Sequence, residues 1–189
     1  MQQLPYAFFD HDAVTVARGL LGKVVKKGAC AGVIVETEAY ALDEASHAVK
    51  KREQGRLMRE TVDRWYIYFT YGMHWCANVT CDARGAGAVL IRAVKPIAGI
   101  EEMRRRRGVE DARRLATGPA RFAEAFGIGK TENGAPLARD FGIFGAPPIA
   151  DEMIVAAPRV GITRAVELPW RFYIKDNPYV SKLPKMKSA

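Results

Sequence analysis

The 189-residue sequence has no apolar run long enough to cross a bilayer and no recognisable export signal. A transmembrane helix needs roughly 20 consecutive apolar residues, and no segment approaches that length. The amino-terminal stretch MQQLPYAFFDHD lacks the basic start and apolar core of a signal peptide. We therefore expect an intracellular protein without a membrane partner.

Cysteine is scarce, with only Cys30, Cys76 and Cys81 in the chain. An odd number of cysteines without an export signal predicts free thiols in a reducing compartment. His74 lies close in sequence to two of them, but strand alternation puts Cys81 on the opposite face from His74 and Cys76. A zinc site is therefore not expected, and we expect no metal and no cofactor.

Signatures of several enzyme classes are also missing. No Ser or Cys lies in a nucleophile elbow, no glycine-rich phosphate loop is present, and no Cys-x-x-Cys pair occurs. The sequence thus gives no support for acyl transfer, nucleotide hydrolysis or thiol redox chemistry. Internal repeats are absent as well, and the length suits one domain over residues 1–189.

Positive charge is what the sequence has in excess. Lys and Arg number 29 against 21 Asp and Glu, which gives a net charge of +8. Residues 92–121, with nine Lys or Arg against four Asp or Glu, supply +5 of it. This balance favours a polyanionic partner such as nucleic acid, although a basic surface alone is a weak signal.

Hydrophobic periodicity predicts helices and strands that do not alternate regularly. A helix is expected to begin at Asp10 or Asp12 and to end near residue 23, whereas the polar residues 42–64 are predicted to be loop or irregular helix. Strands are predicted over 31–40, 65–71, 74–81, 88–94, 152–162 and 170–175, and further helices over 100–107, 110–116 and 117–129. Three strands in succession suggest an antiparallel meander, so the α+β class is favoured over a doubly wound fold.

The strand over 31–40 carries two carboxylates on one face. Because side chains two apart in a strand share a face, Glu36, Glu38 and Tyr40 point the same way. Pairing with surface Arg or Lys would explain both acids. The alternative is a carboxylate held near a pocket, with its pKa tuned for proton transfer. The residue pattern leaves both interpretations open.

An aromatic segment, YIYFTYGMHWC, occupies residues 66–76. Alternation puts Tyr66 and Tyr68 on one face, whereas Tyr71 precedes Gly72 at a predicted hairpin tip and belongs to the other face unless the strand ends before it. A ring at a hairpin tip suits insertion into a partner, although an aromatic stripe is more often core. His47, in the polar segment, is likewise open to a structural or a pocket role.

These segments together resemble the alkyladenine (3-methyladenine) DNA glycosylase family, the methylpurine glycosylases. The resemblance runs from about residue 8 to residue 181 through VARGLLGKVV, GVIVETEAY, DEASHA, YIYFTYGMHWCANV, AVLIRAVKPIAGIEEM, GPARFAEAFGI and RVGITRA followed by WRFYIKDNPYVS. The combination of TEAY, SHA and YGMHWCAN at these separations is specific. The family fold implies a single α+β domain with a curved antiparallel sheet, surrounding helices and a protruding β-hairpin.

The resemblance also implies an activity and a set of site residues. The family flips damaged purines out of duplex DNA and hydrolyses the N-glycosidic bond, leaving an abasic site. The implied roles fall into three groups: Glu38 as the general base and Arg92 as a holder of its water; Tyr40, His47, Tyr68 and Asn78 in the base pocket; Tyr71 and Met73 at the DNA-intercalating hairpin. Double-stranded DNA with alkylated or deaminated purines is the implied partner. We expect an intracellular monomer, which would lie in the cytoplasm or nucleoid if its source is bacterial.

One stretch departs from the family pattern. Members usually carry a motif like Gly-x-Thr-x-Arg-Asn-x-x-Met-Phe between SHA and the aromatic strand, whereas this chain has VKKREQGRLMRETVDRW, with Gly55 and Arg56 as its only apparent remnant. Two alternatives follow for the chain. It could be a lesion-binding protein without catalysis, with an altered pocket loop, or an RNA-binding module on a similar sheet.

Overall fold

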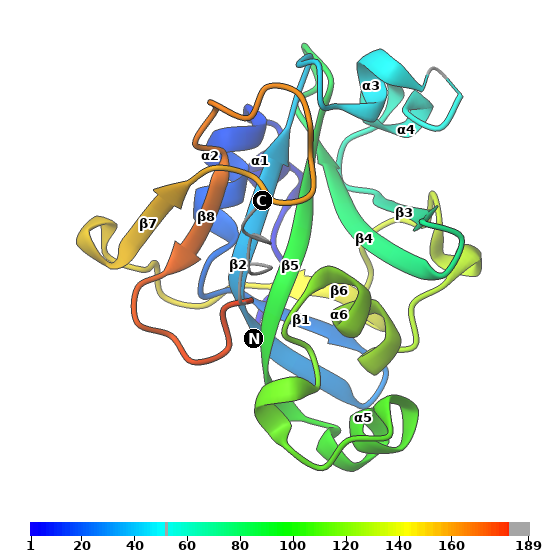
Figure 1. The fold of residues 1–189 in the computed structure, drawn as a ribbon, viewed down its shortest axis with the longest axis vertical. Coiled ribbons are helices and arrows are strands. Elements are labelled where there is room, and N and C mark those ends of the chain that lie inside the picture. Colours follow the sequence, from blue (N-terminus) through cyan, green and yellow to red (C-terminus); the bar gives the residue numbers. More distant parts are fainter. Residues whose placement is uncertain (52, 182–189) are drawn as a thin grey trace, which may run out of the picture.

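The computed structural model describes residues 1–51 and 53–181. Eight strands form one open, curved sheet in this part of the chain, and every strand pair is antiparallel (Figure 1). They are β1 (Val24–Lys27), β2 (Cys30–Tyr40), β3 (Trp65–Thr70), β4 (His74–Cys81), β5 (Gly87–Ala98), β6 (Phe141–Phe144), β7 (Ile154–Ala157) and β8 (Arg171–Ile174). The order is β3-β4-β5-β2-β1-β6, and β8 pairs with the second half of β2 and carries β7 on its outer edge. The α+β prediction with a curved antiparallel sheet is confirmed.

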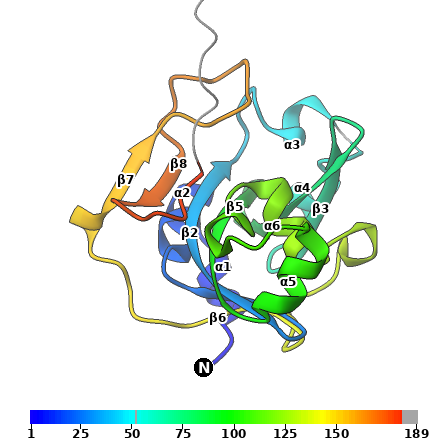
Figure 2. The same ribbon diagram turned by 60° about the horizontal axis from the view of Figure 1, so that its bottom comes forward.

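Short helices flank this sheet. They are α1 (Tyr6–Phe9), α2 (Ala13–Leu20), α3 (His47–Lys50), α4 (Arg56–Glu60), α5 (Ile100–Arg107) and α6 (Pro119–Ala125). Helix α2 packs on β2 and β5 from behind in Figure 1, whereas α6 packs on β4 and β5 from the front. Figure 2 shows α5 next to α6 at the end of the molecule that is turned forward. No helix in the described ranges is long and apolar enough to span a membrane.

Helix α2 begins where its capping signal predicts. The Asp12 carboxylate accepts hydrogen bonds from the backbone N–H groups of Val14 and Thr15, both at 3.0 Å. Asp12, not Asp10, is therefore the cap, and it satisfies two donors that the first helical turn leaves unpaired. Apolar side chains of α2 then enter the main core, with Leu20 fully buried. Burial of this kind supplies about 25 cal/mol per Å² of apolar surface and holds the helix to the sheet.

Two predicted elements differ from the structure. Residues 110–116 form only a 3₁₀ turn, Ala112–Arg114, because the chain then extends alongside β5, where the Val94 N–H donates to the Ala116 carbonyl at 3.0 Å. The strand predicted over 152–162 is confined to β7, since a 3₁₀ turn precedes it and Pro158, which has no N–H to donate to a ladder, follows it. The short strands β1 and β6 and helix α1 were not predicted.

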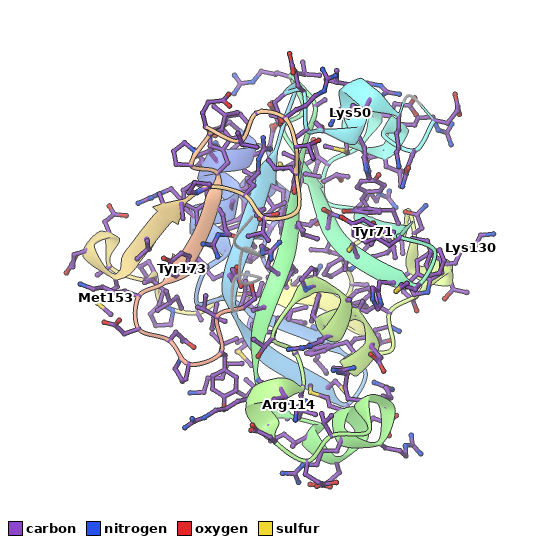
Figure 3. All side chains as sticks on the ribbon, in the orientation of Figure 1. Lys50, Tyr71, Arg114, Lys130, Met153 and Tyr173 are labelled. Carbon is purple, nitrogen blue, oxygen red and sulfur yellow. The ribbon has the colours of Figure 1, made fainter. Side chains whose placement is uncertain are left out.

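The β3–β4 hairpin has a tight two-residue turn. Tyr71 and Gly72 have φ angles of 51° and 66°, and the Met73 N–H donates to the Thr70 carbonyl at 3.1 Å. Two positive φ angles in succession are typical of a type I′ turn, which matches the twist of the flanking strands. Strand β3 thus ends at Thr70, and Tyr71 escapes the strand alternation that set it opposite Tyr68. Tyr71 belongs to the turn itself, and its side chain is 76% exposed and lines the mouth of the cavity described below (Figure 3 labels it).

An irregularity in the β2–β5 pairing places a second site residue. Glu36 pairs with Ala93 and Thr37 pairs with Ile91, so Arg92 is passed over in the ladder. A residue left unpaired by a β-bulge bends its strand and redirects side chains, and bulges are frequent next to active sites. The bulge brings Arg92 toward the two carboxylates of β2.

Candidate active site

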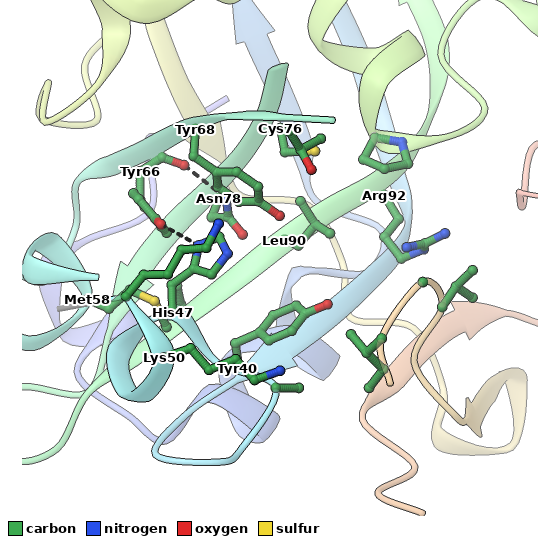
Figure 4. A pocket seen from close by; sticks show the side chains of 18 of the residues that line it. Tyr40, His47, Lys50, Met58, Tyr66, Tyr68, Cys76, Asn78, Leu90 and Arg92 are labelled. Carbon is green, nitrogen blue, oxygen red and sulfur yellow. Dashed lines mark hydrogen bonds between the residues drawn. The ribbon is translucent and has the colours of Figure 1, made fainter. Parts of the chain in front are cut away.

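A cavity of about 420 Å³ opens between the β3–β4 hairpin, helix α3 and the loop of residues 160–163. Its floor is formed by inward side chains of three neighbouring strands, β2, β4 and β5, and β3 and α3 supply its aromatic side (Figure 4). Six of the eight predicted site residues line it: Tyr40, His47, Tyr68, Tyr71, Asn78 and Arg92. The sheet therefore brings together residues that are up to 52 positions apart in sequence.

Glu38 lies directly beneath this floor and has no exposed surface. Its Oε1 atom accepts the backbone N–H of Val160 at 2.7 Å and lies 3.1 Å from Nη1 of Arg92. Its Oε2 atom accepts the Tyr40 hydroxyl at 2.8 Å. A carboxylate offers about four acceptor positions, and the described residues occupy three of those on Glu38. Glu38 is thus fixed in place but retains the capacity to accept one more hydrogen bond.

Glu36, two residues earlier on the same face, accepts four hydrogen bonds from three residues. Oε1 accepts from Nε of Arg92 at 3.0 Å, from Nη1 of Arg171 at 3.1 Å and from the Ser181 hydroxyl at 2.9 Å, while Oε2 accepts the Ser181 N–H at 2.8 Å. All of these groups are buried or nearly so. Glu36 therefore has the structural pairing role, and Arg92 bridges it to Glu38. The neighbouring carboxylates, Glu38 first and then Glu36, raise the pKa of Arg92 although burial alone would lower it.

A buried arginine fastens the loop that covers Glu38. Arg159 makes a two-pronged ion pair with Asp43, at 2.8 and 3.1 Å, and its guanidinium lies over the rings of Tyr40 and Trp170 at 4.8 and 5.2 Å. Planar contacts of this kind suit arginine and not lysine. Because Val160 follows Arg159 directly, this anchor also places the backbone N–H that binds Glu38.

The aromatic side of the cavity is held by a histidine–tyrosine pair. The Tyr66 hydroxyl lies 2.7 Å from Nδ1 of His47, and the His47 and Tyr68 rings meet edge to face with centroids 4.6 Å apart. Burial, helped by the positive charges of Lys51 and Lys50, lowers the pKa of His47 to about 4. His47 is therefore neutral at physiological pH, and its ring presents a polar but uncharged surface to the cavity.

The tyrosine and cysteine side chains of the walls are also uncharged. Burial raises the pKa values of Tyr40 and Tyr68 well above their usual range, and raises the pKa of the Cys76 thiol to about 11. Asn78, 3% exposed, donates through Nδ2 to the backbone carbonyl of Tyr66 at 3.0 Å. This bond leaves the Asn78 carbonyl oxygen without a partner among the described residues, so the floor offers a hydrogen-bond acceptor.

The segment that departs from the family pattern still builds a wall. Gly55 packs against α3 so closely that a Cβ on it would lie 2.3 Å from the His47 carbonyl oxygen. Met58 of α4 lines the cavity, and Arg59 donates to the Ala48 carbonyl at 2.9 Å. A different set of residues thus holds His47 in position. The segment also puts Lys50 and Lys51 on the cavity lining.

The remaining two predicted residues lie outside the lining. Glu38 sits behind it, as described, and Met73 is 66% exposed beside Tyr71 on the hairpin. Tyr66 and Cys76 were not among the predicted site residues, but both line the cavity. For Tyr66 the sequence did contain a signal, because strand alternation placed it on the same face as the predicted pocket residue Tyr68. Val160 gave no signal, because it acts through its backbone.

The described residues contain no group of three or more His, Cys, Asp or Glu side chains arranged to hold a metal ion. Cys30, Cys76 and Cys81 are buried and unpaired, which confirms the prediction of free thiols. What the cavity offers instead is aromatic surface, one buried carboxylate directly behind its lining, and an arginine beside that carboxylate. Such a site suits a planar, polar ligand and proton transfer to a carboxylate.

Comparison with known proteins places the chain. The family model for methylpurine-DNA glycosylase (MPG) matches residues 7–178. A protein of Rhodopseudomonas palustris (strain HaA2) is 43% identical over 183 residues, which cover 92% of this chain and 88% of the relative. A protein of Agrobacterium fabrum is 41% identical over 188 residues, which cover 95% of this chain and 93% of the relative. Both carry the name "Putative 3-methyladenine DNA glycosylase". The chain belongs to the methylpurine-DNA glycosylase family, whose members are hydrolases of N-glycosyl bonds.

Proposed function

We propose that this protein is a monofunctional DNA glycosylase that flips alkylated or deaminated purines out of duplex DNA and hydrolyses the N-glycosidic bond with a water activated by Glu38. The product is an abasic site in an uncut strand. The observation that carries this proposal is the setting of Glu38: a fully buried carboxylate, directly behind the cavity lining, that Tyr40, Arg92 and the Val160 N–H fix in place. Tyr40 and Arg92 both contact Glu38 and line the cavity, so we place the water beside them, where it would donate a hydrogen bond to Glu38.

The chemistry needs little beyond this group. As the bond between C1′ and the purine nitrogen breaks, its electron pair goes to the base and the sugar becomes oxocarbenium-like. The Glu38 carboxylate stabilises that positive charge and accepts a proton from the water that adds to C1′. Arg92 has two N–H donors without a partner among the described residues, and these can orient the same water.

The aromatic residues suit the extrusion of a base. Removing a base from the stack costs a few kcal/mol, and least when the base is damaged or mispaired. The exposed ring of Tyr71, with Met73 beside it, is placed to fill the gap left in the duplex. Stacking on Tyr40 and Tyr68 would repay about 1–3 kcal/mol per ring. The acceptor oxygen of Asn78 would face the flipped base, where a 2-amino group of guanine would crowd it.

The DNA phosphates are contacted by arginines that form no ion pair with a carboxylate in the described ranges. The four arginines of α5 are occupied by ion pairs with nearby glutamates. Arg113, Arg114 and Arg121 have no carboxylate partner in the described ranges (Figure 3 labels Arg114). The first two precede α6, whereas Arg121 lies within this helix, whose Pro119 lines the cavity. Counterion release from the DNA would drive this part of the binding.

The test is base release from a defined duplex by wild type and by Glu38→Gln. We expect wild type to release 3-methyladenine or hypoxanthine and the variant to lose about 10²–10⁴-fold in single-turnover rate, the usual contribution of general base catalysis. Lesion binding should persist in the variant, since the cavity walls are unchanged. Equal rates for the two proteins would remove Glu38 from the mechanism. Binding of the lesion by wild type without any release would instead favour a non-catalytic lesion-binding protein.

A further inference from the structure

Two lysines enter the cavity lining from the segment that departs from the family pattern. Lys50 is the last residue of α3 and Lys51 follows it, and both line the cavity with His47 and Tyr40. Figure 4 shows Lys50 in the part of the wall that holds these two rings. No carboxylate in the described part of the chain forms an ion pair with either lysine, whose backbone segment is exposed. Their ammonium groups are thus available to whatever occupies the cavity.

The other charges around the cavity cancel. Arg92 and Arg171 are matched by Glu36 and Glu38, and Arg159 is matched by Asp43. His47 is neutral, because burial lowers its pKa to about 4 and the positive charges of Lys51 and Lys50 contribute to the same shift. The two lysines therefore give the cavity an uncompensated positive potential. Both lysines are exposed, so added salt screens this potential.

We propose that Lys50 and Lys51 select uncharged purine lesions, such as deaminated bases, over purines that carry a fixed positive charge from N-alkylation. This inference rests on the proposed glycosylase activity of the same cavity. An alkylated purinium that enters the cavity brings a charge of the same sign as the lysines, so its bound state is destabilised. A neutral purine meets no such repulsion on binding.

The same field acts on the departing base. When the bond from C1′ to a neutral purine breaks, the electron pair leaves on the purine as negative charge, and the ammonium groups stabilise it until a proton replaces the lost sugar bond. Water supplies both parts, hydroxide to C1′ and a proton to the base. A purinium becomes neutral on departure and gains nothing from this stabilisation. The lysines therefore favour neutral lesions both in binding and in bond cleavage.

A second role for the lysines predicts a different outcome. If Lys50 and Lys51 bind a backbone phosphate, the loss of their charge weakens every duplex equally, damaged or not, and reduces the salt dependence of binding. Selection by charge changes the ratio between lesions. The ratio of single-turnover rates for a neutral and a cationic lesion in the same sequence separates the two roles.

The experiment compares wild type, Lys50→Gln/Lys51→Gln, and Lys50→Arg/Lys51→Arg on matched duplexes that contain hypoxanthine or 7-methylguanine. The control, Lys26→Gln/Lys175→Gln, removes the same charge at exposed positions outside the cavity. We expect the glutamine pair at 50 and 51 to lower the hypoxanthine to 7-methylguanine rate ratio by about 10-fold, and the arginine pair and the control to leave it unchanged. High salt should reduce the wild-type preference.

An unchanged ratio, with both rates reduced together, would overturn the inference and leave the proposed function intact. Failure of wild type to release either base would overturn the proposed function itself. A ratio that falls equally in the control would show that net charge, and not the place of these two lysines, sets the preference.

Discussion

The floor and the wall of the cavity are built by different means. The floor comes from the paired strands β2, β4 and β5. There Glu38 is fully buried and Arg92 is 6% exposed, and ion pairs and the hydrogen bonds between strands fix both residues. The wall comes from two short helices and the loop of residues 160–163, which are held by a few close contacts. The floor therefore holds its groups in one arrangement, whereas the wall can change its residues without changing the sheet.

That division matches the two demands on a glycosylase site. Proton transfer needs a carboxylate and a water held to within fractions of an ångström, which paired strands provide. The choice of base depends on the shape and charge of what surrounds it, which exposed segments can alter. In this chain the wall is built by short helices and a loop, whereas Glu38, Tyr40 and Arg92 belong to the paired strands β2 and β5.

The largest effect on stability is expected in the floor, at Glu36. Glu36→Gln leaves Arg92 and Arg171 buried with less compensating charge, and breaking a buried pair in this way costs about 3–5 kcal/mol. Urea denaturation should show this loss. Glu38→Gln should cost less, because Arg92 keeps Glu36. Asp151→Asn, which removes a pair whose carboxylate side chain is 88% exposed, should change little. A stable but inactive Glu36→Gln would mean that the two carboxylates share the chemistry.

Within the wall, substitution of Gly55 is expected to reduce stability and activity most. In Gly55→Ala the new Cβ would lie 2.3 Å from the His47 carbonyl oxygen and 2.7 Å from the Ala48 nitrogen, so α3 must move. We expect a loss of about 1–3 kcal/mol and slower base release, because His47 and its contact with Tyr66 shift. Gly129→Ala is the control, since its nearest neighbours lie 4.0 Å away. Normal activity in Gly55→Ala would show that the wall tolerates displacement of His47.

The hairpin tip should show stability and function moving in opposite directions. Tyr71 holds a φ of 51°, which costs an L-residue about 1 kcal/mol, and Asn adopts this conformation readily before glycine. Tyr71→Asn should therefore raise the melting temperature by about 2–4 °C while weakening binding to a lesion duplex. Tyr71→Phe keeps the ring and should change neither property much. A Tyr71→Asn variant that is more stable and binds lesions as wild type does would exclude the wedge role.

The sequence allowed the floor to be predicted better than the wall. Alternation along β2 put Glu36, Glu38 and Tyr40 on one face, and the structure keeps them there. Gly72 marked the turn of the hairpin. These predictions succeed because a strand has a fixed period of two and a two-residue turn has few solutions. The helix predicted over 110–116 failed because pairing with β5 outweighed local helix propensity.

The wall depends on contacts that no local pattern encodes. The Val160 N–H reaches Glu38 because the preceding residue, Arg159, is anchored against the rings of Tyr40 and Trp170. Arg159 also donates a hydrogen bond to the carbonyl of Ala39, which lies more than a hundred residues earlier in the sequence. The bulge at Arg92 likewise results from β2 and β5 pairing along their length. Both features arise from tertiary packing, in which the identity of the neighbour decides the role of a residue.

The wall is also expected to make stability depend on pH. The pKa of His47 is about 4 in the folded protein and about 6.5 in an unfolded chain, so the unfolded chain binds more protons as the pH falls between these values. His47 therefore reduces stability progressively from pH 6.5 to pH 4 and has no such effect above that window. Asp63 acts with the opposite sign, because burial raises its pKa to about 6, so its cost grows as the pH rises toward 6. Thermal unfolding of wild type and His47→Gln at each pH isolates the histidine, since Asp63 is common to both. The difference between their melting temperatures should shift by a few degrees between pH 7 and pH 4, in favour of the variant. If the melting temperatures of the two proteins instead change with pH in parallel, His47 is accessible enough to take up a proton in the folded state.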